Sequence, residues 1–231
     1  MNKITGLGLC LLFFTSSAGA LDLGVGVKAG TAGVGVDLSV ALSKTVNARL
    51  SLTNVDETLD EAIEISDADN SANVDATMDL GFGATGLLLD WYVFDGTFHL
   101  TAGMMRNDSK IDFNGRITDA QVTFGGTTYN VAADFSDPNL SGSISAGESF
   151  EPYLGVGWGR KAGDDPGLAL SVELGVMLMS PEVDLRAPTA TNPANQATLD
   201  ANVDDAESAA NNDLSELEMW PILSFGLNYA F

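Results

Sequence analysis

The last strand-like segment of the chain alternates strictly between large apolar and small or polar side chains. One phase holds Leu223, Phe225, Leu227, Tyr229 and the terminal Phe231, and the other holds Ser224, Gly226, Asn228 and Ala230. Successive side chains of a strand point to opposite faces, so this strand has a bulky apolar face and a small polar face. A chain that ends in this way is constrained to a sheet whose greasy face meets either lipid or a protein core.

The same period of two recurs along the chain. It is clear in segments 21–30, 33–43, 46–53, 98–107, 151–160 and 168–179. In the remaining segment, 78–94, the apolar phase switches after Ala84, and Gly86 stands at the switch. A β-bulge supplies one extra residue at such a point, so we predict a bulge at Gly86, which keeps Asp90 away from lipid. With the last strand, this makes eight strands.

The connections between these segments sort by parity. Short ones at 43–45, 95–97 and 161–167 alternate with long ones at 54–77, 108–150 and 181–218, apart from a short first connection near Gly30. Short periplasmic turns alternating with longer outer loops are typical of transmembrane barrels. The sequence therefore predicts an all-β fold: an eight-stranded antiparallel transmembrane β-barrel with short periplasmic turns and long extracellular loops. A soluble periplasmic β-protein is the alternative.

The first twenty residues have the pattern of a secretory signal peptide. Lys3 precedes an apolar stretch over 4–14, and Ala18-Gly19-Ala20 is a small-residue cleavage site. We therefore expect a signal peptide at 1–20, a single β-barrel domain at 21–231 and a location in the bacterial outer membrane. Cys10 would leave with the signal, so the mature domain is expected to contain no disulfide.

The charge of the chain is strongly acidic. Ten basic residues stand against 32 acidic ones, for a net charge of −22. Phosphate binding requires the opposite sign, so a nucleic-acid partner is excluded.

Six charged or titratable side chains fall on the inward phase of the predicted strands. They are Lys28, Asp37, Arg49, Asp90, His99 and Glu173. We expect Arg49 between Asp37 and Asp90, with Glu173 approaching from the far wall, because charges buried without partners cost several kcal/mol. This polar network is either a gated passage or a static plug. The narrow interior of an eight-stranded barrel favours the plug, although inward glycines free volume for water.

The sequence gives no sign of a catalytic site. His99 is the only histidine, and its strand places it near the 95–97 turn with Leu100 next to it and no serine beside it. A Ser–His–acid arrangement therefore has no support, and we expect a protein that is not an enzyme.

The predicted outer loops hold much of the acidity. Within 54–77, Asp67, Asp69 and Asp75 alternate with Ser71 and Asn73 as oxygen ligands that Ca²⁺ or Mg²⁺ would accept. Ala72 stands where an EF-hand needs glycine and Met78 where it needs glutamate, so solvated, mutually repelling loops are the competing interpretation. No other cofactor is expected. A hairpin is predicted around Gly125-Gly126, a helix over 203–218 and a mobile segment over 182–202.

The chain resembles the small eight-stranded outer-membrane barrels, the OmpA, OmpX and OmpW group. The most specific part of the resemblance is the ending from Trp220 to Phe231. The resemblance implies that Tyr229 and Phe231 form a C-terminal signal read by the barrel-assembly machinery. It also implies outer-membrane lipid and lipopolysaccharide as surroundings, and a non-enzymatic role in envelope structure or surface interaction. A narrow, OmpW-like, porin-like channel for small, hydrophobic molecules is the alternative. The oligomeric state is left open.

Overall fold

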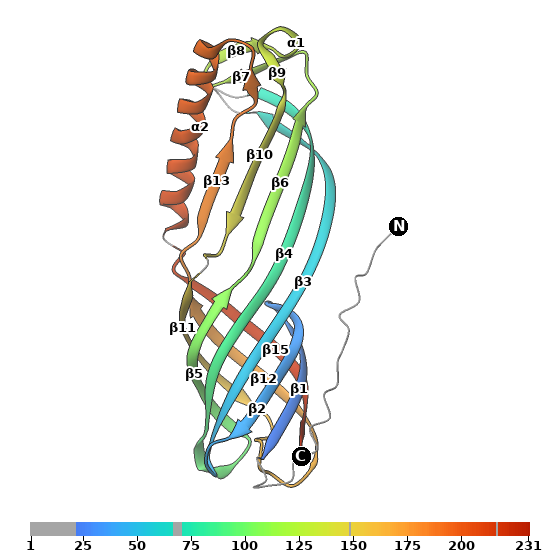
Figure 1. The fold of residues 1–231 in the computed structure, drawn as a ribbon, viewed down its shortest axis with the longest axis vertical. Coiled ribbons are helices and arrows are strands. Elements are labelled where there is room, and N and C mark those ends of the chain that lie inside the picture. Colours follow the sequence, from blue (N-terminus) through green and yellow to red (C-terminus); the bar gives the residue numbers. More distant parts are fainter. Residues whose placement is uncertain (1–21, 67–70, 148, 216) are drawn as a thin grey trace.

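The structure is a computed structural model that describes residues 22–66, 71–147, 149–215 and 217–231 (Figure 1). The predicted signal peptide at 1–20 lies outside these residues. Eight strands form the lower part of the molecule. They are β1 (Leu23–Gly30), β2 (Gly33–Ala41), β3 (Val46–Ser66), β4 (Ser71–Tyr92), β5 (Phe98–Asn107), β11 (Phe150–Trp158), β12 (Gly167–Leu178) and β15 (Met219–Ala230).

These eight strands pair in a closed, fully antiparallel ring. β1 pairs with β2, β2 with β3, β3 with β4 and β4 with β5; β5 then pairs with β11, and β11 with β12. The C-terminal strand β15 completes the ring by pairing with both β12 and β1. Closure removes the unpaired strand edges that an open sheet would leave.

The outer surface of the ring is apolar, and the lower part of its interior is lined by small or polar side chains. Outward side chains include Leu170, which is 78% exposed, and Phe225, which is 58% exposed, whereas Asp37, Ser51 and Glu173 are buried inside. The phases expected for the C-terminal strand and for the other six alternating segments are therefore confirmed by the pattern of burial.

The predicted bulge at Gly86 is wrong. The register of β4 runs without a shift through Gly86 on both sides, opposite Ser51 of β3 and Met105 of β5. Ala84 and Leu88 both point into the ring, in phase with Asp90. The apolar side chains that suggested a switch, Leu80 and Phe82, keep this inward phase but lie above the ring, where the same face of β4 packs in a second sheet.

That second sheet, here called the extension, rises above the ring (Figure 1). It consists of the part of β3 that follows Asn54, the part of β4 that precedes Ala84, and strands β6 (Lys110–Ile117), β10 (Asn139–Ser145) and β13 (Glu182–Arg186). These strands pair in that order. The stretches expected to be loops at 54–77, 108–150 and 181–218 therefore contain regular structure. Sequence reasoning ended the strands too early because acidic residues in an exposed strand look like loop residues.

Smaller elements cap the extension: β7 (Gln121–Phe124), β8 (Thr127–Asn130), α1 (Val131–Asp134), β9 (Phe135–Asp137) and β14 (Thr189–Ala190). At the other end a 3-10 turn, η1 (Val93–Asp95), joins β4 to β5. The hairpin predicted around Gly125-Gly126 is confirmed as β7–β8. Both glycines have positive φ, +56° and +73°, as the two central residues of a type I′ hairpin turn require.

Helix α2 (Pro193–Leu214) lies along the free edge of β13 (Figure 1). Asn192 caps its first turn by accepting a hydrogen bond from Ala194 N, and Pro193 occupies its first position. The helix expected over 203–218 is confirmed over 203–214, but it starts ten residues earlier, at Pro193. The mobile segment expected over 182–202 is wrong, because it contains β13, β14 and the first half of α2. None of the described helices is long and apolar enough to span a membrane.

The described residues form two separate apolar clusters. One lies in the extension, where Leu199 of α2 packs with Val74, Ile117, Val122 and Tyr129. The other lies inside the upper part of the ring and includes Leu88, Met105, Tyr153, Met177 and Ile222. The ring and the extension thus each have a core of their own.

Candidate functional site

The inside of the ring brings the six inward charged or titratable residues into one region. Each comes from a different strand: Lys28 from β1, Asp37 from β2, Arg49 from β3, Asp90 from β4, His99 from β5 and Glu173 from β12. The inward phase of each strand places them there, and all are buried except Lys28, which is largely covered. We refer to these residues and their hydrogen-bond partners as the interior network.

Arg49 is the centre of the interior network. Its guanidinium donates two hydrogen bonds to Asp90, from Nε to Oδ2 at 2.8 Å and from Nη2 to Oδ1 at 2.9 Å. Nη2 also donates to Glu173 Oε2 at 2.5 Å, and Nη1 donates to Asp37 Oδ2 at 3.2 Å. The flat, five-donor guanidinium suits three carboxylates at once in a way that a lysine ammonium does not.

Lys28 is the second cation of the interior network. Its ammonium lies 2.9 Å from Asp37 Oδ1 and donates a hydrogen bond of 2.6 Å to Ser51 Oγ. Three carboxylates therefore face two permanent cations. His99 lies beside them, with Nε2 3.9 Å from Glu173 Oε2.

Two uncharged side chains that sequence reasoning did not select complete the interior network. Thr101 donates to Asp90 Oδ1 at 2.8 Å, and Tyr153 donates to Glu173 Oε1 at 2.6 Å. Their inward phase was the available signal, but hydroxyl groups at such positions are common and carried no distinguishing mark. With Tyr153 from β11, the interior network ties together seven of the eight ring strands.

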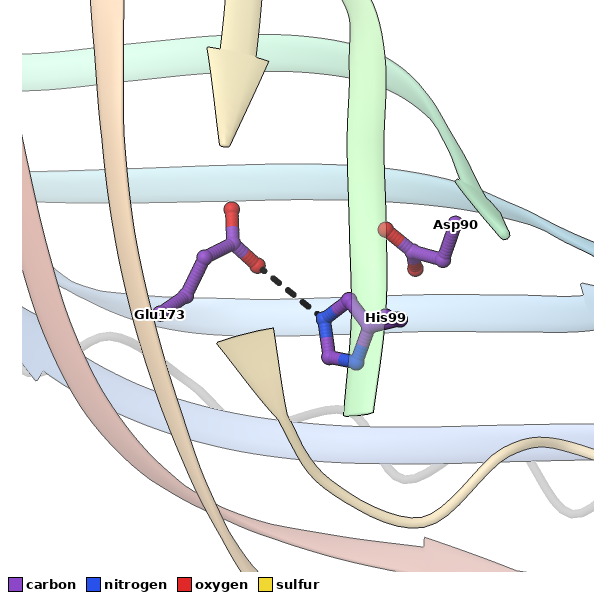
Figure 2. Close-up of side chains that lie close together, drawn as sticks. All are labelled: Asp90, His99 and Glu173. Atoms are coloured by element: carbon purple, nitrogen blue, oxygen red, sulfur yellow. Dashed lines mark ion pairs between the residues drawn. The ribbon is translucent and has the colours of Figure 1, made fainter. Parts of the chain in front are cut away.

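Asp90, His99 and Glu173 are close enough for their ligand atoms to share a metal ion (Figure 2). One potential ligand atom from each lies within 4.8 Å of the others, and all three residues are buried. Both carboxylates, however, already accept hydrogen bonds from Arg49, and Asp90 and Glu173 also accept from Thr101 and Tyr153. The Arg49 guanidinium supplies the positive charge that a metal ion would otherwise bring, so the geometry is that of an ion-pair network.

Inward glycines make room for the large side chains of the interior network. A Cβ at Gly157 would lie 2.5 Å from His99 Nε2, and a Cβ at Gly175 would overlap the hydroxyl of Tyr153. Gly155, paired opposite Gly175, lies against the same tyrosine ring. The volume that these three glycines free is therefore filled by His99 and Tyr153, whereas the inward Gly24 and Gly26 line a small cavity.

Little space remains inside the ring. A cavity of about 30 Å³ lies beside Lys28, Asp37 and Glu173 and continues toward Arg160 and Asn228 at the lower end. This is room for a few water molecules at most. Above the charged layer, the apolar cluster of Leu88, Met105, Met177 and Ile222 fills the upper part of the ring.

Of the three acidic residues proposed for a divalent cation, one lies among the described residues. Asp67 and Asp69 lie outside the described residues, and Asp75 is exposed on β4 opposite Arg116 of β6. Nearby, Asn73 donates to Asp119 through its side chain at 3.0 Å and its backbone N–H at 2.8 Å. These hydrogen bonds, the side-chain ones foremost, lower the pKa of the Asp119 carboxyl.

Tyr229 and Phe231 lie at the lower end of the ring on its outer side. Their rings meet edge to face with centroids 5.0 Å apart, and Phe231 N donates to Leu23 O. The C-terminal aromatics therefore flank the seam where the first and last strands pair.

No protein-family model matches the chain, and no curated protein matches it in sequence. Among solved structures, it is similar to the crystal structure of Acinetobacter baumannii CarO2, with 17% identity and a TM-score of 0.52 over 90% of this chain and 98% of that chain. The crystal structure of Acinetobacter baumannii CarO is also similar, at 17% identity and a TM-score of 0.49, over 90% of this chain and 97% of that chain. The similarity to CarO2 shows a shared fold, an antiparallel all-β sheet that includes a ring of eight strands.

Proposed function

We propose that this chain is an outer-membrane β-barrel protein with a closed interior, and that it serves in envelope structure or surface interaction without catalysing a reaction. The apolar outer surface of the ring supports a place in lipid, because soluble proteins rarely expose so continuous an apolar surface. The fold shared with CarO2 supports an outer-membrane location. The eight ring strands are then the membrane-spanning part.

The observation that carries this proposal is the double closure of the ring interior. A charged layer centred on Arg49 links seven strands, and an apolar layer that includes Leu88 and Met177 lies above it. A solute crossing the ring would have to displace both layers. A permanent passage is therefore not expected, and the part of the molecule free to act is the extension.

In this proposal the short turns face the periplasm and the extension faces outward, among lipopolysaccharide. Divalent cations would bridge the acidic extension and the anionic lipid. The barrel-assembly machinery would read the strand that ends in Tyr229 and Phe231. This strand forms the closing seam of the ring, because β15 pairs with both β1 and β12.

We also propose that His99 has a structural role and not a catalytic one. Its neighbours are Glu173 and the ring of Tyr92, with ring centroids 4.9 Å apart, and a hydrogen bond of 3.4 Å joins Nδ1 to the backbone oxygen of Thr97. A residue held in this way, beneath the apolar layer, is suited to holding strands together rather than to acting on surface lipid.

Single-channel conductance in planar bilayers tests the closed interior. The folded protein, verified by its heat-dependent gel mobility, is expected to be silent. Steady, discrete openings would overturn the closed barrel and favour the alternative, a narrow channel for small, hydrophobic molecules.

The orientation of the ring in the membrane is tested separately with single introduced cysteines. The mature chain is expected to contain no cysteine of its own, so each introduced thiol would be the only one to react. Thr189→Cys lies in the extension and Gly96→Cys in a lower turn, and both sites are exposed. On intact cells a membrane-impermeant maleimide is expected to label the first and not the second. Labelling of Gly96→Cys alone would reverse the proposed orientation, and equal labelling of both on intact cells would contradict a membrane-spanning ring.

A further inference from the structure

The extension leaves one long strand edge without a partner. Strand β3 pairs with β2 only as far as Asn54, opposite Val34, but continues alongside β4 to Ser66. Among the described residues, nothing pairs with the other side of β3 from Val55 onward. An unpaired edge of this length presents a row of free N–H and C=O groups, which is a template for another strand.

The register shows which backbone groups are free. Tyr92 N donates to Thr45 O, so odd-numbered residues of β3 direct their N–H and C=O groups to β4. Even-numbered residues therefore direct theirs to the open side. Above Asn54 these are Asp56, Thr58, Asp60, Ala62, Glu64 and Ser66.

The two faces of the extension differ. On the face continuous with the ring interior, Val55 and Leu59 of β3 lie opposite Phe82 and Met78 of β4, and the exposed Glu57 lies between them on β3. Val55 is 39% exposed and Leu59 is 40% exposed. The opposite face is polar, with Asp56, Thr58 and Asp60 of β3 followed by Asp79, Asp112 and Asp184 on the other strands.

The open edge is also strongly negative. Between Val55 and Ser66 the sequence carries five acidic residues and no basic one. Asp56 and Asp60 accept hydrogen bonds from Asn54 and Thr77, which are uncharged, so neither is neutralised by these partners. Like charges directly opposite each other destabilise strand pairing, which disfavours a second copy of this chain at the same edge.

We infer that the open edge of β3, from Val55 to Ser66, binds an extended peptide whose residues alternate between basic and apolar. Such a peptide adds a strand to the sheet through the free backbone groups of residues such as Thr58 and Asp60. Its apolar side chains continue the row of Val55 and Leu59, and its basic side chains lie beside Asp56 and Asp60. The inference goes beyond the proposed function, because binding at this edge does not depend on whether the ring interior is closed.

The test uses the full mature protein folded in detergent and two fluorescent ten-residue peptides. One alternates Lys and Val; the other has five Lys followed by five Val, so that charge and composition are the same. The alternating peptide is expected to bind at least tenfold more tightly. Equal affinity of the two peptides would mean that they bind through general attraction to an acidic surface, which would contradict the inference. Absence of binding by the alternating peptide would refute it outright.

Variants at Thr58 identify the edge. Thr58→Pro removes an N–H that faces the open side while leaving the pairing with β4 intact, and proline is tolerated at such edge positions. It is expected to weaken binding of the alternating peptide at least tenfold. The matched control, Thr58→Ala, loses the side-chain hydrogen bond to Asp79 but keeps the N–H, so it should bind within twofold of the unmodified protein.

Two further outcomes are decisive. If Thr58→Pro does not fold, two N-methylated forms of the alternating peptide replace it, one methylated at the odd-numbered residues and one at the even-numbered residues. A tenfold loss of affinity for one form, whose methyl groups block the N–H groups that face β3, supports the inference. An unchanged affinity for both forms overturns it. Sedimentation shows whether the protein is a dimer that Thr58→Pro converts to a monomer, in which case the edge belongs to a second copy of the chain and the inference is wrong.

Discussion

The ring interior and the extension both carry many acidic side chains but use them in opposite ways. Inside the ring, Asp37, Asp90 and Glu173 are all gripped by one buried arginine. On the extension, Asp56 and Asp60 are exposed, and among the described residues their hydrogen-bond partners are the uncharged Asn54 and Thr77. Buried charges must be paired, whereas exposed charges need only water.

The difference teaches how one acidic chain builds both a closed unit and an open one. The ion pairs and hydrogen bonds of the interior network together link seven strands of the ring around Arg49. Unpaired acids along β3 do the reverse: they keep a free edge soluble and prevent it from pairing with itself. Each prediction below separates these two uses of charge.

The largest effect is expected for Arg49→Leu. The change leaves three largely buried carboxylates without their shared cation, so we expect a loss of about 3–5 kcal/mol in the free energy of unfolding. Urea unfolding, followed by tryptophan fluorescence and gel mobility, measures it. The matched control is Arg106→Leu, whose side chain is 46% exposed and pairs with Asp108, and which should lose about 0–1 kcal/mol. Equal losses in the two variants would show that the interior network does not hold the ring.

The next effect tests the fit of Tyr153 rather than charge. In Gly175→Ala the new methyl group overlaps the Tyr153 hydroxyl and must push it away from Glu173. Overpacking of this kind costs about 1–3 kcal/mol. Gly96→Ala is the control, since nothing lies within 4 Å of its added Cβ. A Gly175→Ala protein as stable as the control would mean that the ring adapts at this point and that the glycine is not required.

Much of the ring, but little of the extension, follows from the sequence. The inward phase of Arg49 and Glu173 is readable because lipid on one face and a filled interior on the other enforce strict alternation. The upper parts of β3 and β4 have water on at least one side, so acidic residues such as Asp56 and Asp79 are tolerated in strands and hide them. Tyr153 and Thr101 were missed because hydroxyl side chains are common at inward positions, and nothing in the sequence marks these two as partners of Glu173 and Asp90.

A moderate effect confined to the extension is expected for Asn211→Ala. Helix α2 buries little apolar surface and is held to β13 by polar side chains. Asn211 accepts from Val183 N at 2.8 Å and donates to Val183 O at 3.0 Å, while Glu207 accepts from Leu185 N. Leaving both Val183 groups unpaired should cost about 1–3 kcal/mol of local stability.

Hydrogen exchange of the β13 amides measures this local opening. Asn212→Ala, one residue further along the helix, is the control, because its side chain forms no hydrogen bond with β13. Exchange in Asn211→Ala should quicken in β13 and stay unchanged in the ring strands. Faster exchange throughout the ring would contradict the view that the two parts are held independently.

The smallest effect is a pH dependence at Asp119. Because the hydrogen bonds from Asn73 lower its folded-state pKa below the ordinary 3.8, they stabilise the extension above that value. Their contribution is lost as the pH falls through the folded-state pKa. Asp119→Asn should therefore speed hydrogen exchange around Asn73 relative to the unmodified protein at pH 6, with a difference that shrinks toward pH 3. A difference that is the same at both pH values would trace the effect to packing instead of charge, since only the carboxylate titrates in this range.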